Sequence, residues 1–347
     1  MIPGDGIGQE VVPAGVQVLQ AAGRRYGSFS LDLTWFDWGC DYYLRHGRMM
    51  PADGLDILRG FDAIYFGACG FPTVPDHVSL WGLRLAICQG FDQYVCLRPA
   101  RLLEGVAAPL AGKRPGDVDV VVVRENTEGL YGGAGGRTHR GLPNETATQI
   151  QVFTRDGVER IIRYAFDLAA RRPRRRLTSA TKSNACQYTM TLWDDVFAET
   201  ARRYPTVETD VQLIDSLAAR CVSRPESLDV IVGCNLFGDI LSDLTGALVG
   251  GLGLAPSANM DPLRRYPSMF EPVHGSAPDI FGKGIANPIA AIWSGAMMLE
   301  FLGQEAAAGA LVRAIEATLR AGRTRTPDLG GAATTQEMAA AVMEHLE

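Results

Sequence analysis

Residues 235–243 read Asn-Leu-Phe-Gly-Asp-Ile-Leu-Ser-Asp and follow, after Cys234, a short apolar segment, Leu228–Gly233. The apolar segment is typical of a buried strand. If a helix begins at Gly238, Asp239 and Asp243 lie on one face of it, with side chains about 6 Å apart. Two aligned carboxylates attract a hard divalent cation such as Mg²⁺ or Mn²⁺. The alternative is an acidic first turn that complements the helix dipole, and the motif alone leaves both interpretations open.

Short apolar runs and helical patterns alternate along the rest of the chain. Apolar runs bounded by turn residues predict strands at Phe61–Gly67 and Val118–Val123, and Phe29–Trp38 alternates as a strand does. Buried strands separated by helices indicate an α/β fold built on parallel strands. Helices are expected at Gln9–Tyr26, Val158–Ala170, Pro288–Leu302 and Gln304–Ala321.

Composition narrows the class of protein. A chain of 347 residues is long for a single core, which favours two domains. The 33 Lys and Arg against 39 Asp and Glu give a net charge of −6, so there is no electrostatic reason to bind nucleic acid or an anionic membrane. We therefore expect neither partner. The basic run Arg171–Arg176 is a nucleic-acid patch or a solvated connection, and the acidic whole favours the connection.

Localisation is predicted from three features. The first residues show no basic and apolar leader pattern, and the apolar stretch Pro288–Leu299 is too short to cross a bilayer. The seven cysteines are odd in number and form no Cys-x-x-Cys pair. We expect reduced thiols in a cytoplasmic protein, with neither a disulfide framework nor a zinc site.

Residues 123–133 form a second stretch with reactive side chains. They follow an apolar strand, and α/β proteins place ligands at the carboxyl ends of strands. Arg124 can bind a carboxylate through two parallel bonds, and Tyr131 can donate a proton. Arg98, upstream, offers another guanidinium. A polar turn with a packed aromatic side chain is the alternative interpretation.

Residues 271–280 form a third stretch, Glu-Pro-Val-His-Gly-Ser-Ala-Pro-Asp-Ile, which continues to Asn287. Its small residues let a ligand approach the backbone, and a lone acid can accept both hydroxyls of a ribose. It is not a Rossmann fingerprint, and the glycines at residues 4–8 have the wrong spacing for one. Nor is there a Walker A motif, because Gly112-Lys113 is followed by Arg114.

These motifs resemble those of the decarboxylating β-hydroxyacid dehydrogenases, which include the isocitrate, isopropylmalate, homoisocitrate and tartrate/D-malate enzymes. The similarity runs from residues 3–8 to residues 326–331. Within the family, residues 76–82, 91–94 and 177–184 are most similar to the tartrate/D-malate branch. The isopropylmalate branch would have an apolar pocket lining at the positions of Ser79 and Trp81.

The resemblance implies a two-lobed α/β fold of the isocitrate/isopropylmalate dehydrogenase type, with a cleft between the lobes, rather than a Rossmann fold. Residues 1–95 and 247–347 would form the larger, cofactor-binding lobe. Residues 96–246 would form the smaller lobe, with the dimer interface, the metal site and the catalytic residues. A homodimer that shares its two active sites is implied as well.

The resemblance also assigns roles in the site. Asp239 and Asp243 correspond to metal ligands, and Asp215 corresponds to the ligand that the partner subunit contributes beside the substrate. Lys182, also from the partner, corresponds to the general base, and Tyr131 to the acid. Arg98 and Arg124 correspond to clamps for substrate carboxylates.

The cofactors implied are NAD and Mn²⁺ or Mg²⁺, with a monovalent cation such as K⁺ as a further candidate. Asp279 favours NAD, because an acid pairs with a 2′-hydroxyl and repels a 2′-phosphate. The substrate expected is a small 2-hydroxy acid, D-malate or tartrate, oxidised and decarboxylated with the metal as Lewis acid. The residues that correspond to the adenosine-binding loop are His274, Gly275, Ser276, Ala277, Asp279, Ile280 and Asn287.

One expected arginine is missing. The family has an arginine nine positions before Leu97, where this chain has Cys88, and the next residue, Gln89, is also uncharged. Cys96 replaces the usual asparagine before Leu97. Arg84 lies one helical turn before Cys88, so it either replaces the clamp and alters substrate choice or points to solvent in a decayed enzyme.

Two alternative functions follow from that gap. One is a catalytically impaired relative that acts as a binding or regulatory subunit, and the other is an isopropylmalate-type activity.

A further expectation concerns the start of the chain. Family members have a strand of roughly eight residues before the turn that begins at Pro3, whereas only Met1 and Ile2 precede Pro3 here. We expect an upstream extension to raise solubility and melting temperature.

Overall fold

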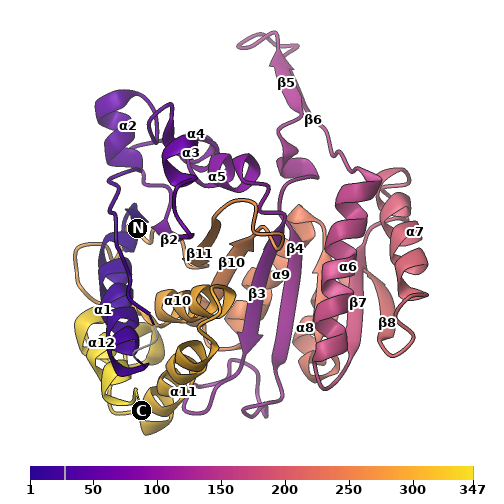
Figure 1. Cartoon of the computed structure of the whole chain (residues 1–347). Coiled ribbons are helices and arrows are strands. Elements are labelled where there is room, and N and C mark those ends of the chain that lie inside the picture. Colours follow the sequence, from indigo (N-terminus) through magenta and orange to yellow (C-terminus); the bar gives the residue numbers. More distant parts are fainter. Residues whose placement is uncertain (27–28, 347) are drawn as a thin grey trace. The chain divides into compact units, whose positions relative to one another are not determined.

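Two units make up the chain in the computed structural model, which describes residues 1–26 and 29–346 (Figure 1). Unit 1 comprises Met1–Gln93, Arg98–Val118 and Gly246–Glu347, and unit 2 comprises Tyr94–Leu97 and Asp119–Thr245. Each unit carries its own strands and covering helices, so the predicted α/β architecture is confirmed.

Unit 1 is built on a mixed sheet. Its strands lie in the order β1, β2, β11, β10 and β3, with β1 and β11 parallel to β2 and β10 antiparallel to β11. The strands are β1 (Ile2–Gly4), β2 (Ala63–Ala68), β3 (Val95–Arg101, whose residues up to Leu97 belong to unit 2), β10 (Pro256–Met260) and β11 (Ser268–Pro272). The helices are α1 (Gly8–Tyr26), α2 (Cys40–His46), α3 (Gly54–Leu58), α4 (Asp76–Gly82), α5 (Arg84–Gly90), α10 (Ile289–Phe301), α11 (Glu305–Ala321) and α12 (Thr335–Glu344).

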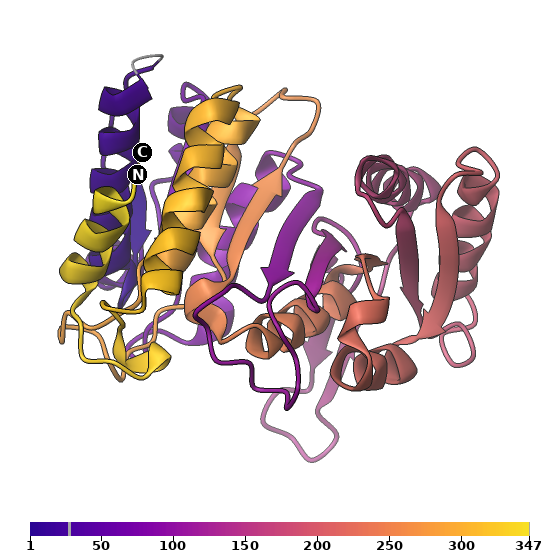
Figure 2. The ribbon, with the colours of Figure 1, turned by 90° about the horizontal axis from the view of Figure 1, so that it is seen from below.

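The helices predicted from apolar spacing form much of the core of unit 1. The apolar positions of α1 are buried, and α10 is buried on nearly all sides, as expected for a helix that is apolar all round. α1 packs against α10, α11 and α12, and Figure 2 shows the indigo α1 beside the gold and yellow C-terminal helices. None of the described helices is long and apolar enough to span a membrane.

Unit 2 is built on parallel strands in the order β4, β9, β7 and β8. These strands are β4 (Asp119–Glu125), β7 (Arg176–Thr181), β8 (Glu208–Leu213) and β9 (Val230–Gly233). Its helices are α6 (Arg155–Arg171), α7 (Thr189–Ala201), α8 (Ile214–Ser223) and α9 (Asn235–Leu248), the last of which ends in unit 1. A separate antiparallel hairpin joins β5 (Gly135–Thr138) to β6 (Thr146–Gln149).

Three predictions about the fold are wrong. Phe29–Trp38 forms no strand; its alternation instead brings Phe36 and Trp38 against the core, with the two rings stacked at 4.4 Å. The helix with the two aspartates begins at Asn235, not Gly238. The segment Arg98–Val118, predicted in the smaller lobe, belongs to unit 1, because β3 pairs with β10 and Arg325 donates to the Gly105 carbonyl.

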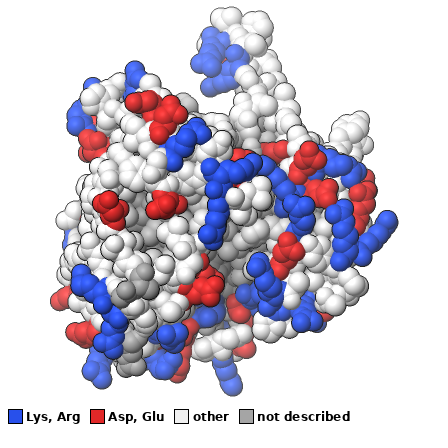
Figure 3. Space-filling model, viewed as in Figure 1, with Lys and Arg blue, Asp and Glu red and all other residues white. Residues whose placement is uncertain are grey.

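The basic run before β7 has a structural role. Arg172 Nε binds the buried carboxylate of Asp229 at 2.5 Å, and Arg174 approaches the same carboxylate at 3.6 Å. Both arginines also bind the backbone carbonyl of Asp119. Part of the run is thus a set of half-buried ion pairs rather than a freely solvated connection. On the face shown in Figure 3, basic and acidic side chains are mixed.

All seven cysteines are free thiols, as predicted. Most are buried, and burial raises the pKa of the Cys234 thiol to about 12. Such thiols are protonated near neutral pH and behave as small apolar side chains.

Two glycines with the same backbone conformation provide a test of this packing. Gly4 and Gly47 have φ values of +67° and +69°, but a Cβ on Gly4 would lie 1.9 Å from the Ala68 carbonyl oxygen, whereas one on Gly47 would meet nothing. We expect Gly47→Ala to lower the free energy of unfolding by about 1 kcal/mol, the cost of the left-handed conformation. Gly4→Ala should cost several times more in urea titrations; equal losses would show that β1 has room to move away from β2.

Candidate active site

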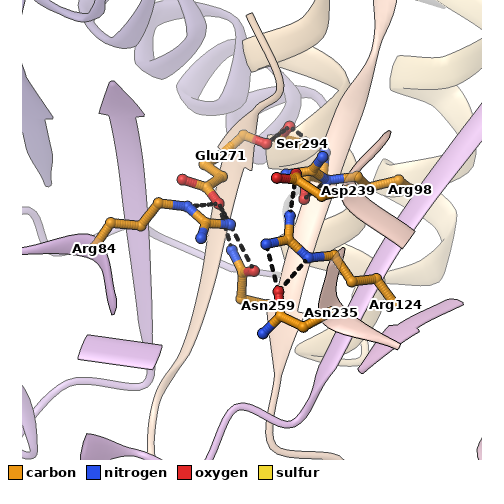
Figure 4. A network of polar contacts seen from close by, with 9 residues as sticks. Arg84, Arg98, Arg124, Asn235, Asp239, Asn259, Glu271 and Ser294 are labelled. Carbon is orange, nitrogen blue, oxygen red and sulfur yellow. Dashed lines mark hydrogen bonds and ion pairs between the residues drawn. The ribbon is translucent and has the colours of Figure 1, made fainter. Parts of the chain in front are cut away.

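Arg124 is the centre of a polar cluster in unit 2 (Figure 4). It ends the apolar part of β4, and its side chain is only 2% exposed. Its Nε and Nη2 donate to Asn235 Oδ1 at 3.0 and 2.7 Å, and its Nη1 contacts Asp239 Oδ1. A Cβ on Gly238 would lie 2.6 Å from the Arg124 Cβ, so this glycine lets α9 pack closely on the arginine. The guanidinium is therefore fixed by the start of α9.

Asp239 and Asp243 lie on α9, four residues apart as predicted. Because α9 begins at Asn235, its first turn has no acidic residue, and the dipole-complementing alternative for Asp239 is wrong. Asp239 Oδ2 accepts a hydrogen bond from the Tyr131 hydroxyl at 3.2 Å. Tyr131 lies in the single 3-10 turn Leu130–Gly132 that follows β4, so the predicted acid and the predicted metal ligand are in contact.

Lys182 and Asp215 are paired with each other. The Lys182 Nζ lies 2.6 Å from Asp215 Oδ1, and the hydrogen bond lowers the pKa of the exposed Asp215 carboxyl. Within residues 1–26 and 29–346, no three His, Cys, Asp or Glu side chains form a group that could hold a metal ion. One chain therefore does not bring Asp215 together with Asp239 and Asp243. Carboxylate oxygens such as these are nevertheless the donor type that Mg²⁺ and Mn²⁺ prefer.

Two residues that support this cluster were not predicted. Asn235 receives two bonds from Arg124, and Glu125 is a buried carboxylate that accepts from the Thr127 backbone and hydroxyl and from the Glu128 backbone at 2.8 to 2.9 Å. These bonds fix the loop after β4. The available signal was position: Glu125 ends the strand β4, and Asn235 begins the helix that follows β9 after Cys234.

In unit 1, Arg84 begins α5 and is buried rather than pointing to solvent, so that alternative is wrong. Its Nε and Nη2 approach Glu271 Oε1 at 2.8 and 2.6 Å, and Nη2 also donates to Asn259 Oδ1 at 3.2 Å (Figure 4). Asn259 Nδ2 donates to the same Glu271 oxygen at 2.7 Å. Glu271 and Asn259, on neighbouring strands, were not predicted as partners of Arg84.

Cys88 lies in the apolar core of unit 1. Its side chain is fully buried and belongs to the apolar core with Leu83, Ile87 and Phe91. Arg98, on β3, is also buried, and its Nε lies 3.4 Å from the Ser257 hydroxyl.

The loop after β11 has features of a nucleotide site. His274 Nε2 is buried and lacks a hydrogen-bond partner within the described part of the chain, and burial lowers the pKa of the imidazole. Gly6 must be glycine, because a Cβ there would lie 2.0 Å from the Ser276 carbonyl oxygen. Ile7 N donates to that oxygen at 2.8 Å. An orphaned nitrogen on a backbone-anchored loop fits a ligand that brings its own hydrogen-bonding edge.

The remaining predicted loop residues differ in their accessibility. Gly275 and Asp279 are exposed, and Ser276, Ala277 and Ile280 are half-buried. Asn287 is buried: its amide binds Asp328 at 3.0 Å and accepts from the Ile289 backbone at 3.0 Å. Asn287 therefore anchors the end of the loop to α10, while Asp279 is the loop acid open to solvent.

Fold and site together define an α/β enzyme of small organic acids, because a buried arginine at the carboxyl end of a parallel strand suits carboxylate binding. The chain belongs to the isocitrate/isopropylmalate dehydrogenase family, whose model matches residues 1–342.

Individual relatives agree with this family. The chain is 58% identical to a probable tartrate dehydrogenase/decarboxylase of Agrobacterium vitis, over 98% of this chain and 93% of that protein. It is 56% identical to the decarboxylating D-malate dehydrogenase of Escherichia coli K12, over 98% and 96%. The crystal structure of isocitrate dehydrogenase from Methylococcus capsulatus matches with a TM-score of 0.88 at 39% identity, covering 99% of this chain and 98% of the other.

Proposed function

We propose that the protein catalyses the NAD-dependent oxidative decarboxylation of a small 2-hydroxy dicarboxylic acid, D-malate or tartrate, with Mn²⁺ or Mg²⁺. The observation that carries this proposal is the hydrogen-bonded set of Arg124, Tyr131 and Asp239, in a chain more than half identical to enzymes named for these two substrates. When bound, the cation supplies Lewis acidity to the substrate oxygen and NAD accepts the hydride.

The chain's own residues have the following tasks. Arg124 binds a substrate carboxylate with a guanidinium that Asn235 holds in place. Asp239 and Asp243 of one chain, together with Asp215 of the partner subunit, would hold the cation. Lys182 of the partner subunit takes the proton of the substrate hydroxyl as a neutral amine, for which it must first leave its ion pair with Asp215 and give up its own extra proton. Tyr131 gives a proton to the carbon that loses CO₂.

The exposed surface of unit 2 supports a homodimer that shares its active sites. All eight residues of the hairpin strands β5 and β6 are exposed. A lone two-stranded hairpin is marginally stable in water, and Leu142, Ile150 and Val152 beside it are exposed apolar side chains. A second copy of the chain would cover this surface and could bring its Lys182 and Asp215 to the site of the first.

An impaired relative that acts as a binding or regulatory subunit is the second candidate. The observation in its favour is that Cys88 lies in the apolar core and provides no guanidinium.

A substrate panel separates the two candidates. We expect NADH formation with Mn²⁺ and D-malate or a tartrate, and much slower turnover of isocitrate and isopropylmalate, because their larger substituents need other pocket linings. The measurement is initial absorbance rate at 340 nm across the panel, with a chelator control. No turnover of any acid, by protein whose folding is confirmed by circular dichroism, would favour the impaired relative.

Cofactor choice is predicted to depend on Asp279. This carboxylate is exposed on the loop after β11, where it would accept the ribose hydroxyls of NAD and repel the phosphate of NADP. The ratio of kcat/KM for NAD to that for NADP should be large and should fall by at least about tenfold in Asp279→Lys, since a repulsion becomes an attraction. Asp53→Lys, an equally exposed charge reversal elsewhere in unit 1, is the control. Equal use of both cofactors by the unmodified protein would contradict the assignment.

Shared sites predict complementation between inactive variants. Asp239→Asn and Lys182→Met should each abolish activity alone, whereas subunit exchange should restore about one quarter of it, because half the dimers are mixed and one of their two sites is intact. The mixture of Asp239→Asn with Asp243→Asn is the matched control and should stay inactive, since both residues serve their own chain's site. Absence of recovery in the first mixture, with exchange verified by mass spectrometry, would place all these residues in one chain's site.

A further inference from the structure

A cavity of about 550 Å³ in unit 1 is not used by the proposed reaction. Its lining comes from residues 3–9 around the end of β1, from residues 35–45 around the start of α2, and from Phe281 in the loop after β11. The first two segments are joined where Cys40 N donates to Asp5 Oδ1 at 2.7 Å. Among the described residues that line the cavity are none of the seven loop residues assigned to the adenosine, so the cavity is a candidate site of its own.

Two aromatic side chains on its walls are open to solvent. Trp35 and Phe281 are 46% and 41% exposed, although both residue types are mostly buried in proteins. The Phe281 ring packs edge-on against Phe71 at 5.8 Å, and this contact orients it. The face of an aromatic ring carries a negative potential that attracts a cation, most strongly in tryptophan. These walls therefore offer apolar contact and electrostatic attraction to a positively charged organic molecule.

The charged side chains of the lining are mainly acidic. They are the carboxylates of Asp5, Asp37 and Asp41 and the single guanidinium of Arg45. Arg45 binds Asp37 Oδ2 at 2.5 Å, but it reaches only the backbone carbonyl of Asp41, at 3.3 Å. In the described part of the chain, the exposed carboxylate of Asp41 has no ion pair. One acid of the lining is thus neutralised and Asp41 is not.

Asp5 has only neutral partners. Its buried carboxylate accepts from Cys40 N, Cys40 Sγ and Gly70 N at 2.7, 3.2 and 2.8 Å. Burial, and after it the hydrogen bond and charge of Asp5, raise the pKa of the Cys40 thiol to about 12, so this thiol stays protonated. Burial lowers the pKa of the Met1 amino group to about 6, so that group adds little positive charge near neutral pH. The lining therefore has an excess of negative charge.

We propose that this cavity binds a small organic cation, whose apolar part packs against Trp35 and Phe281. Its ammonium group faces the carboxylate of Asp41, and the other acids of the lining add to the attraction. The site is independent of the proposed oxidation, because none of its residues is assigned to the substrate, the divalent metal or the nucleotide.

Other classes of ligand fit this lining less well. An anion would meet the excess of carboxylates and be repelled. A bare divalent metal ion needs several converging ligands, and no group of three His, Cys, Asp or Glu in the described ranges provides them. A neutral apolar molecule would cover the acids without compensating their charge. An organic cation matches both the rings and the carboxylates, and the volume is usual for a small-molecule site.

The main test compares choline with its uncharged analogue, in which a carbon atom replaces the quaternary nitrogen. Calorimetric titration of the unmodified protein should show saturable binding of choline. The analogue has the same shape but lacks the attraction to the rings and acids, so it should bind at least about tenfold more weakly. Potassium chloride at the same ionic strength is the control for charge screening and should give no saturable heat.

Variants assign the binding to this cavity. Trp35→Leu and Asp41→Asn should each weaken choline binding about fivefold or more, since one removes a ring face and the other a carboxylate. Trp35→Phe should retain part of the affinity because it keeps a ring. Asp53→Asn, which removes an exposed acid of unit 1 outside the cavity, is the matched control and should bind choline as the unmodified protein does.

Three results would overturn the inference. They are the absence of saturable choline binding, equal affinity for choline and its uncharged analogue, and unchanged affinity in Trp35→Leu or in Asp41→Asn. The last result would place the choline elsewhere on the molecule. No readout here depends on turnover, so a protein that oxidises none of the acids would contradict the proposed function and leave this test intact.

Discussion

A carboxylate that leaves water must find its compensation inside the protein, and this constraint organises both units. Glu125 and Glu271 are both buried, one in each unit, yet their pKa values shift in opposite directions. Glu125 receives only backbone N–H groups and a hydroxyl, and burial outweighs these dipoles. Glu271 faces two guanidiniums, and the full charges outweigh burial. Dipoles suffice to fix a loop in place, whereas a strand that must carry a stable negative charge needs an arginine.

The same constraint explains why the arginines lie where they do. Arg124 and Arg84 each occupy a buried position, and each is bound by an amide as well as by an acid: Asn235 with Asp239, and Asn259 with Glu271. The amide oxygen orients the guanidinium group without cancelling its charge. An arginine held in this way has its orientation set by two partners rather than by its acid alone.

Local pattern was enough to predict most elements of the fold and part of the site. α10 is apolar on all sides and β9 is a short apolar run, so their burial follows from hydrophobicity alone. From the sequence, Tyr131 and Asp239 could be predicted to lie near each other but not to be in contact. Both residues follow parallel strands, and the carboxyl ends of parallel strands lie at one edge of the sheet. Two of the three failures share a cause. The conformation of Phe29–Trp38 and the unit to which Arg98–Val118 belongs depend on partners distant in the sequence, and the spacing of residues gives no information on such partners.

The pairing of Arg84 with Glu271 shows where the limit lies. The two residues are 187 positions apart, and on sequence alone Arg84 was either a clamp or a solvent-exposed side chain. In the structure Arg84 is buried and paired with Glu271 instead of reaching solvent, and Cys88, one turn later, lies in the apolar core. With the arginine expected at position 88 absent, the positive charge on α5 lies one turn earlier and touches a protein carboxylate. Which carboxylate a buried arginine pairs with can therefore be recognised only once the residues that share the buried space are known.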